Sequence, residues 1–403
     1  MMKVKNLNFF LILLLIVSSN CDKPEYNPTT TPIDPSGNPT CTKTDNDVKN
    51  STYHDQKNFG IGLTYYNDDI IIKQFYINDN NFANSVLHFY KINGSSIQLS
   101  DMTVSQPVSN SINNETNIVL NENVMLDGYN LYKKINNKWK FKQQLPSFSE
   151  AIPSVICGLK FGFAKSLSDN ILFISDPEGS RYLSSKQGVV FICEITNDSI
   201  YKRPTFIEAS DRDVEDNFGY SIASENSLLV VGAPNNDDNG INRGSAYIFI
   251  KQPSGIWQEV KKLLNSDGKA NDQFGKVVSI SEKYIYIGAP NKDNGKVYVY
   301  NKNTYKEEHI ISGKSYNKNF GKAIVAKSNK LFISSDQQFV VVPKSATITS
   351  FNDSNFNEIV CNYQISNVTL SYYDFATNFI LTPNLLIANY IGGFDYKIYI
   401  FEY

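Results

Sequence analysis

The stretch Asn217-Phe-Gly-Tyr-Ser-Ile-Ala-Ser-Glu-Asn-Ser-Leu-Leu-Val-Val-Gly-Ala-Pro234 recurs 56 residues later as Gln273-Phe-Gly-Lys-Val-Val-Ser-Ile-Ser-Glu-Lys-Tyr-Ile-Tyr-Ile-Gly-Ala-Pro290. Both copies start with Phe-Gly, continue with an alternating run, a polar pair and an apolar run, and end with Gly-Ala-Pro. Such self-similarity outweighs any single motif, because it defines a structural unit that must stack on its neighbours to bury a core.

Weaker copies of this stretch extend through most of the chain. Measured from Phe59, the successive Phe positions are 102, 57, 56, 46 and 55 residues apart, and the last is a decayed Phe375-Ala376. The first step is twice 51, which indicates a copy near residue 110 that has lost its Phe-Gly. Residues 47–403 then hold seven repeats of 51 residues each. The retained Phe-Gly pairs are Phe59 and Gly60, Phe161 and Gly162, Phe218 and Gly219, Phe274 and Gly275, and Phe320 and Gly321.

The copy that starts at Phe218 predicts four short strands. Its residues 218–224 alternate apolar and polar, 228–231 form a buried-type run, and 245–250 and 257–263 supply two further strands after turns. Four antiparallel strands in about 40–50 residues, repeated radially, are typical of a β-propeller blade. We therefore expect an all-β, seven-bladed propeller of four-stranded blades, with the Phe and Gly-Ala-Pro positions between blades.

These residues resemble the FG-GAP repeats of the integrin alpha-chain N-terminal propeller and of many bacterial surface proteins. The resemblance implies a seven-bladed ring with a binding or adhesive role. Integrin-type repeats carry a calcium loop, Asp-x-Asp/Asn-x-Asp-Gly-x-x-Asp, between the first and second strands. Here that junction is only residues 224–227 or 281–283, too short to present the roughly six to eight oxygens that Ca²⁺ requires. We therefore expect no cofactor and no response of stability to calcium.

Acidic loops are the remaining candidates for a cation or ligand site. Asp237 and Asp238 follow one Gly-Ala-Pro, and Asp293 follows the next. Turn chemistry explains the same composition and is the favoured interpretation, because Asn, Asp and Gly tolerate left-handed backbone and bond to their own main chain. Further acidic residues precede two Phe-Gly pairs: Asp211, Asp213, Glu215, Asp216, Asp267 and Asp272.

The N-terminus predicts export. Nine unbroken apolar residues at 9–17 follow a basic start, too few to span a bilayer but typical of a signal-peptide core. Cys21 then resembles a bacterial lipoprotein processing site, and Asn20 and Ser18 before it resemble the relaxed sites of Bacteroidota. The alternative is an ordinary signal peptide followed by a chance cysteine. We favour the lipoprotein, with a signal peptide at 1–20 and the lipid on Cys21, because the following segment is typical of a tether.

Residues 21–46 are expected to form a lipid-anchored tether. This segment is rich in Pro and Thr and nearly free of apolar residues, so it cannot bury a core and is typical of an extended spacer. The predicted location is the outer membrane, with the propeller on the cell surface or the periplasmic face.

Four cysteines remain after Cys21, and an even number in an exported chain allows two disulfides. Cys41 and Cys361 fall on fourth-strand segments that a closed ring makes neighbours, so we expect these two to pair, which leaves Cys157 for Cys193. The alternative, that these four cysteines are free buried thiols, is nearly as well supported.

Closure of the ring requires one further strand. The chain ends on what aligns with a third strand, at residues 397–403, so the seventh blade lacks its fourth. We expect residues 42–53 to pair with that last strand, because an open apolar edge invites association with another chain.

The composition argues for binding rather than catalysis. The chain has three His and no His-Glu-x-x-His, Gly-x-Ser-x-Gly or Cys-x-x-Cys signature. Its net charge of −2 gives no reason to expect nucleic-acid binding. We therefore expect a non-enzymatic surface module that recognises a protein or glycan through propeller loops. The alternatives are a propeller enzyme, such as a polysaccharide lyase or hydrolase, and a structural partner in an envelope complex.

The lipid anchor is tested by fractionation. In a Bacteroidota host, the wild type should sediment with membranes and Cys21→Ser should become soluble, because the variant cannot carry the lipid. A Cys21→Ser protein that stays with membranes as the wild type does would place the anchor elsewhere.

Overall fold

The structure is a computed structural model. It describes residues 59–67, 69–77, 83–93, 96–104, 118–145, 155, 157–158, 160–180, 185–196, 204–238, 240–314, 317–327, 330–337, 346–352, 358–364, 375–381, 385–392 and 395–402. The chain divides into two compact units, Met1–Thr40 and Cys41–Tyr403. The first unit lies outside the described residues, as does the predicted lipidation site at Cys21, and every strand below belongs to the second.

The described residues form seven antiparallel sheets, numbered here in chain order. Sheets one to three comprise β1 (Phe59–Tyr66), β2 (Asp69–Ile77), β3 (Ala83–Asn93) and β4 (Ser96–Val104); β5 (Ile118–Leu120), β6 (Val124–Asp127), β7 (Asn130–Ile135) and β8 (Lys138–Gln144); β9 (Lys165–Ser168), β10 (Ile171–Asp176), β11 (Val189–Glu194) and β12 (Thr205–Ile207).

The later sheets contain the two full copies of the repeat and the C-terminal strands. Sheets four to seven comprise β13 (Ser221–Glu225), β14 (Leu228–Ala233), β15 (Ser245–Lys251) and β16 (Trp257–Leu263); β17 (Val277–Ile280), β18 (Tyr284–Ala289), β19 (Lys296–Asn301) and β20 (Glu307–Ser312); β21 (Asn317–Lys318), β22 (Ile324–Lys327), β23 (Lys330–Gln337), β24 (Ala346–Asn352) and β25 (Glu358–Gln364); β26 (Phe375–Leu381), β27 (Leu385–Gly392) and β28 (Asp395–Glu402).

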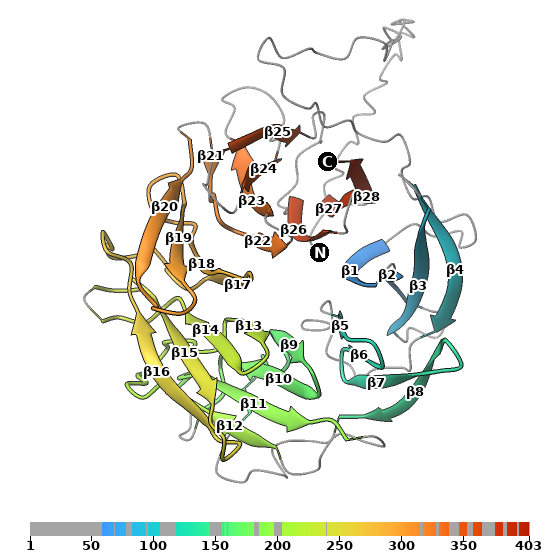
Figure 1. The fold of residues 1–403 in the computed structure, drawn as a ribbon, viewed down its shortest axis with the longest axis horizontal. Helices are drawn as coiled ribbons and strands as arrows, with labels where there is room; N and C mark the ends of the chain where they lie inside the picture. Colours follow the sequence, from blue (N-terminus) through green and yellow to red (C-terminus); the bar gives the residue numbers. More distant parts are fainter. Residues whose placement is uncertain are drawn as a thin grey trace, which may run out of the picture. The chain divides into compact units, whose positions relative to one another are not determined.

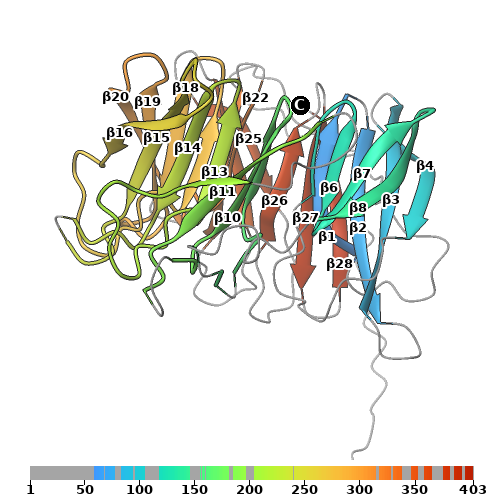
Figure 2. The ribbon, with the colours of Figure 1, turned by 90° about the horizontal axis from the view of Figure 1, so that it is seen from below.

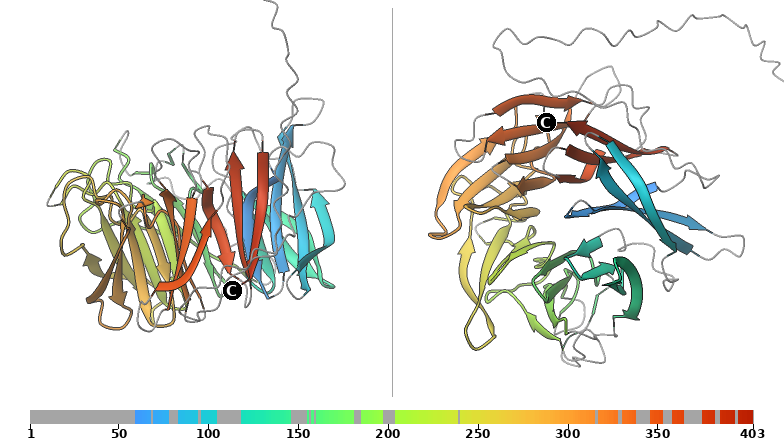
Figure 3. Two further views of the ribbon diagram at one scale, coloured as in Figure 1. Left: turned by 90° about the horizontal axis from the view of Figure 1, so that it is seen from above. Right: turned by 45° about the vertical axis from the view of Figure 1, so that its right-hand side comes forward.

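The first strands of the sheets lie innermost and contact one another in series. Within the unit Cys41–Tyr403, contacts run from β1 through β5, β9, β13, β17, β22 and β26, and return from β26 to β1. Figure 1 shows the sheets following one another around this series, and the side views show the strands running across its thickness (Figures 2 and 3). This is the β-propeller arrangement that the repeats predict.

The repeat assignment agrees with the sheets. Phe59 opens β1 and Phe375 opens β26, while the other Phe-Gly pairs directly precede β9, β13, β17 and β22. Residues 118–145, where no Phe-Gly remains, still form the four-stranded second sheet. The seventh sheet has three described strands, and residues 42–53, expected to complete it, lie outside the described residues, so this part of the closure stays a prediction.

Three of the Phe-Gly pairs, at Phe218, Phe274 and Phe320, bind the backbone of the sheet before them. The amide of Phe274 donates to the carbonyl of Arg243 at 2.9 Å, and a Cβ on Gly244 would lie 2.1 Å from the Phe274 carbonyl oxygen. Gly244 also has φ +87°, so no other residue fits there without strain. The same contact joins Phe218 to Gln187 and Phe320 to Asn294, beside Gly188 and Gly295.

The glycine of each Gly-Ala-Pro contacts the glycine of the next Phe-Gly, across the same boundary between two sheets. A Cβ on Gly232 would lie 1.9 Å from the Gly275 carbonyl oxygen, and one on Gly288 would lie 2.4 Å from that of Gly321. The expected position of both motifs between adjacent sheets is thus confirmed by the geometry, because glycine alone allows two backbones to approach this closely.

The apolar cores lie between sheets and not within one. Phe274 packs with Val230 and Ile248 of the fourth sheet and with Ile287 and Tyr298 of the fifth. Equivalent clusters join the second sheet to the third, the third to the fourth, and the fifth to the sixth. The first sheet packs on the second and, through Ile387, on the seventh. A single sheet therefore has no core of its own, as expected for stacked repeats.

The outer edges are interrupted by β-bulges. Five of the described pairs between a third and a fourth strand shift register, as where Ile248 and Phe249 face Lys261 and Glu259 and leave Val260 unpaired. Bulges twist an edge away from further pairing. The exception is β12, which has three residues and a regular register with β11.

The predicted Cys157–Cys193 disulfide is not formed. Both cysteines are free thiols at one apolar cluster, Cys193 buried within it and Cys157 at its margin. Burial raises the pKa of Cys193 to about 12, and burial together with the Asp176 carboxylate raises the pKa of Cys157 to about 11. The thiolates needed for oxidation are therefore disfavoured. Cys361 lies in β25, but Cys41 is outside the described residues, so their pairing stays a prediction.

Among the described residues, no helix combines the length and the apolar character needed to cross a membrane.

A buried ion pair joins the first two sheets and allows a direct test. Lys73 Nζ lies 2.5 Å from Asp127 Oδ1, and the two side chains are 1% and 0% exposed. Lys73→Met should lower the free energy of unfolding by about 3–5 kcal/mol, because it leaves a buried carboxylate without its ammonium. Adding Asp127→Leu should recover more than half of that loss. Denaturant unfolding of the two single variants and the double variant measures this, and additive losses would contradict it.

Candidate functional site

The acidic segments that precede two Phe-Gly pairs are connectors fastened to the next sheet. The backbone N–H and Oγ of Ser210 donate to the two carboxylate oxygens of Glu259 on β16, both at 2.9 Å. Ser266 makes the same pair of hydrogen bonds to Glu307 on β20, at 3.2 and 2.5 Å. Each connector therefore crosses from one sheet and is held by the fourth strand of the next.

The aspartate after each serine accepts hydrogen bonds from a tyrosine on the third strand of that sheet and from a lysine on its third or fourth strand. Asp211 accepts Tyr247 Oη at 2.9 Å and Lys262 Nζ at 2.5 Å. Burial alone would raise the pKa of Asp211, but the hydrogen bonds from Lys262 and Tyr247 hold it below its usual value. Asp267 repeats the arrangement with Tyr298 and Lys296, at 2.5 and 2.6 Å.

A second aspartate, two residues before the Phe, closes each connector on itself. Asp216 is 1% exposed, and its Oδ2 accepts the Asp213 amide at 2.8 Å and Asn236 Nδ2 at 3.2 Å. Burial raises the pKa of Asp216 to about 6, although these hydrogen bonds oppose the shift. In the next repeat Asp272 accepts the Lys269 amide and also pairs with Lys292 Nζ at 3.1 Å.

The three weak metal candidates bind groups of the protein itself. Asp237 Oδ1 accepts the Asn242 amide at 2.7 Å, a turn interaction. Asp238 pairs with Lys262 at 2.5 Å, and Asp293 pairs with Lys296 at 3.5 Å. No group of three potential metal ligands occurs in the part of the chain that the structure describes. Two of the three carboxylates thus face a lysine ammonium, and indifference to calcium stays a prediction.

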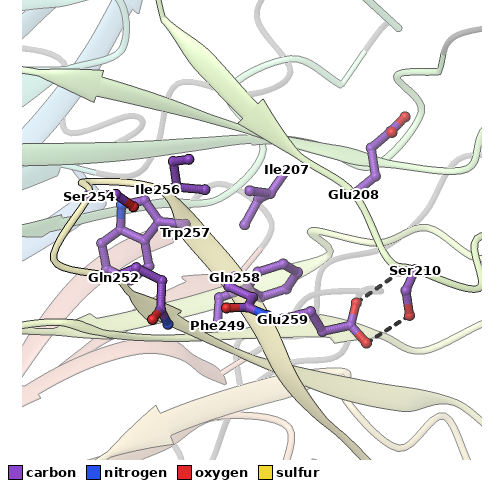
Figure 4. Close-up of a pocket in the computed structure, with 10 residues that line it drawn as sticks. All are labelled: Ile207, Glu208, Ser210, Phe249, Gln252, Ser254, Ile256, Trp257, Gln258 and Glu259. Atoms are coloured by element: carbon purple, nitrogen blue, oxygen red, sulfur yellow. Dashed lines mark hydrogen bonds between the residues drawn. The ribbon is translucent and has the colours of Figure 1, made fainter.

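A pocket of about 430 Å³ opens at the outer edge, where the third sheet meets the fourth (Figure 4). One wall comes from the end of β12 and the connector after it, and the other from β15, β16 and the turn between them. Its lining residues are Ile207, Glu208, Ser210, Phe249, Gln252, Ser254, Ile256, Trp257, Gln258 and Glu259.

The shortness of β12 explains where the pocket forms. It spans three residues, whereas β16 beside it spans seven. Phe249 and Trp257 are nearly buried and belong to the core between the two sheets, where Trp257 meets the Phe173 ring edge-on at 5.0 Å. Ile256 at the mouth is 67% exposed. The pocket thus has an aromatic and aliphatic floor with a border of amides, hydroxyls and carboxylates.

Sequence reasoning missed both the connector and the pocket. The signal for the connector is Ser-Asp-x-x-x-x-Asp-x-Phe-Gly, which occurs at Ser210 and Ser266, and the predictions treated its acidic residues as turn chemistry or a cation site. The pocket has no local signal, because its two walls come from different repeats.

The buried carboxyl of Asp216 predicts a pH dependence. The unfolded chain loses this proton near pH 3.8, whereas the folded protein keeps it to about pH 6, so this group lowers stability as pH rises between those values. Relative to wild type, Asp216→Asn should therefore gain up to about 3 kcal/mol between pH 4 and pH 7, from roughly two pKa units at 1.36 kcal/mol each.

Urea unfolding at pH 4, 5, 6 and 7 measures this difference. Asp211→Asn is the matched control of opposite sign, because the pKa of Asp211 is lowered in the folded state and its contribution is lost as pH falls. A difference for Asp216→Asn that stays flat across this range would contradict the raised pKa.

Comparisons with known proteins identify the repeat. The model of the FG-GAP repeat family matches residues 205–249 and 257–300, and no curated protein matches the chain. Among solved structures, the β-propeller domain of the Trilobed protease from Pyrococcus furiosus has a TM-score of 0.47 and 9% identity over 86% of this chain and 94% of that one.

Two further propellers give similar values. The Dos1 propeller has a TM-score of 0.49 and 10% identity over 87% of this chain and 93% of that one. The WD40 domain of SCAP from fission yeast has a TM-score of 0.44 and 8% identity over 87% and 97% of the two chains. The family match covers both full copies of the Phe-Gly to Gly-Ala-Pro stretch, and the sheets stack as those copies predict. The chain therefore carries two copies that match the FG-GAP repeat, within sheets arranged as a β-propeller.

Proposed function

We propose that this propeller is a non-catalytic binding module, exported, lipid-anchored through Cys21 and displayed on the cell surface, which recognises a protein or glycan. The observation that carries the proposal is the pocket between the third and fourth sheets. It joins apolar surface from Phe249, Trp257 and Ile256 to polar groups at its border, the combination by which ligand sites obtain both affinity and orientation.

The roles of the acidic side chains support binding over catalysis. The carboxylates of Asp211, Asp267 and Asp272 are occupied by tyrosine, lysine or backbone donors that hold the connectors in place. His88 is buried beside Gln74 at 3.0 Å, and burial lowers its pKa to about 4. An imidazole with that pKa is a poor general base near neutral pH.

The proposal is tested by comparing two exposed isoleucines. Ile256 at the mouth of the pocket is 67% exposed and Ile241, in a loop away from the lining residues, is 66% exposed. Each is changed to Lys in the soluble Cys21→Ser background, and both proteins are applied to a glycan array and used to capture partners from envelope extracts. Ile256→Lys should lower retention of the bound species at least tenfold, because it places a charge on the apolar mouth.

Ile241→Lys should retain the same species as the parent protein. Equal retention by both variants, with equal melting temperatures, would exclude the pocket as the binding site. Chemical modification or cleavage of the retained species would instead favour the propeller-enzyme alternative.

A further inference from the structure

The carboxylate of Glu259 has fewer partners within the protein than its counterpart one repeat later. The corresponding residue, Glu307, accepts both donors of Ser266 and in addition Tyr300 Oη at 3.2 Å. The residue opposite Glu259 on the third strand is Phe249, where Tyr300 stands opposite Glu307. Phe249 has no hydroxyl and donates no such hydrogen bond to Glu259. One acceptor position of Glu259 is therefore not filled by the residue opposite, whereas in Glu307 the Tyr300 hydroxyl fills it.

The orientation of that carboxylate is fixed although its acceptor capacity is not exhausted. The amide and hydroxyl of Ser210 each bind one of its two oxygens, as Figure 4 shows. A carboxylate offers about four acceptor sites, so two remain at a group that is already held in place. This arrangement suits a planar fork of two N–H donors, the geometry by which a guanidinium binds a carboxylate.

Among the described lining residues, two are carboxylates, Glu208 and Glu259, and none is a lysine or an arginine. Glu208 lies 3.8 Å from Arg212, so part of its charge is already balanced. At the position of Glu208 the next repeat has Leu264, counted back from Phe274 as Glu208 is from Phe218. Both differences between the repeats, Phe249 for Tyr300 and Glu208 for Leu264, therefore make this pocket better suited to a cation.

The floor of the pocket suits an aliphatic stem. Ile207, Ile256 and Trp257 give apolar surface beside Glu259, and long cationic side chains bury their methylene groups on such surface while the charged end stays at the polar border. An indole is also the aromatic ring to which cations bind best.

Resting on the proposed function, we propose that this pocket takes an arginine side chain of a protein partner. The stem lies on Ile256 and Trp257, and the guanidinium donates two hydrogen bonds to the carboxylate of Glu259. A neutral or acidic glycan offers no cation for this carboxylate, and a lysine ammonium cannot make the planar fork.

The chain provides its own reporter. It has two tryptophans, Trp139 on β8 and Trp257 in the pocket, so Trp139→Phe leaves the indole of the pocket as the one tryptophan signal. The probes are acetylated, amidated five-residue peptides with Ser-Leu on one side and Leu-Ser on the other, and with Arg, Lys, citrulline or Glu at the centre. The arginine peptide should change the Trp257 emission saturably. Citrulline, which keeps the shape and loses the charge, should bind at least tenfold more weakly, Lys several-fold more weakly, and Glu not at all.

Two variants examine the carboxylate itself. Glu259→Gln should weaken the arginine peptide at least tenfold, while Glu307→Gln, the matched residue of the next sheet, should leave it unchanged. Phe249→Tyr restores the hydroxyl that the next repeat has, and should weaken the peptide several-fold by occupying Glu259 from within. Circular dichroism checks that each variant is folded, and the peptide series on the Trp139→Phe protein alone suffices if one is not.

Equal binding of the citrulline and arginine peptides would overturn the inference, as would unchanged affinity in Glu259→Gln. Saturation of the Trp257 signal by neutral oligosaccharides but not by the arginine peptide would assign the pocket to a glycan. If the peptide fails while Ile256→Lys still loses its captured species, the inference alone is wrong. If Ile256→Lys retains its species as well, the proposed function fails with it.

Discussion

The rest of this propeller depends on one backbone contact, which the amides of Phe218, Phe274 and Phe320 make with a carbonyl of the preceding sheet. At Phe274 the partner is Arg243, and Gly244 beside it leaves no room for a Cβ. This contact sets the spacing of adjacent sheets, and that spacing decides which side chains meet in the core between them. A sheet with two apolar faces has no other way to bury them, so the contact recurs wherever the repeat is well kept.

The acidic residues around each Phe-Gly follow from the same constraint. The connector between two sheets must turn sharply before the Phe of the next Phe-Gly. The residue directly before that Phe has a left-handed φ of 54–56°, at Asn217, Gln273 and Asn319. Such a turn exposes backbone donors that need acceptors. Asp216 and Asp272 accept them from within the connector, while Ser210 and Ser266 fix it to Glu259 and Glu307. Carboxylates here hold the connector by binding donors of the protein itself, a role that their number in the sequence did not reveal.

The fold could be predicted from the sequence because its determinants are local and repeated. Phe218 and Gly232 occupy the same positions in their repeat as Phe274 and Gly288 in the next, and the alternation of apolar and polar residues between them locates the strands. The candidate site could not be predicted, since Ile207 and Trp257 meet only after two sheets pack. The expected disulfide between Cys157 and Cys193 was wrong for a related reason. An even number of cysteines allowed the pairing, but it does not reveal the apolar surroundings in which both remain thiols.

The position of the pocket follows from how the ring protects its edges. The bulges in the fourth strands of five sheets turn their edges away from a further strand, whereas β12 is short and regular. A short fourth strand needs no bulge, because it offers few free backbone groups, but it leaves the start of β16 uncovered. Trp257 packs at the outer end of the core between the third and fourth sheets and is buried there, whereas Ile256 next to it stays exposed. Apolar surface beside an oriented carboxylate thus arises at this boundary as a consequence of edge protection. Phe249 and Glu208, which stand where the next repeat has Tyr300 and Leu264, both lie at that surface.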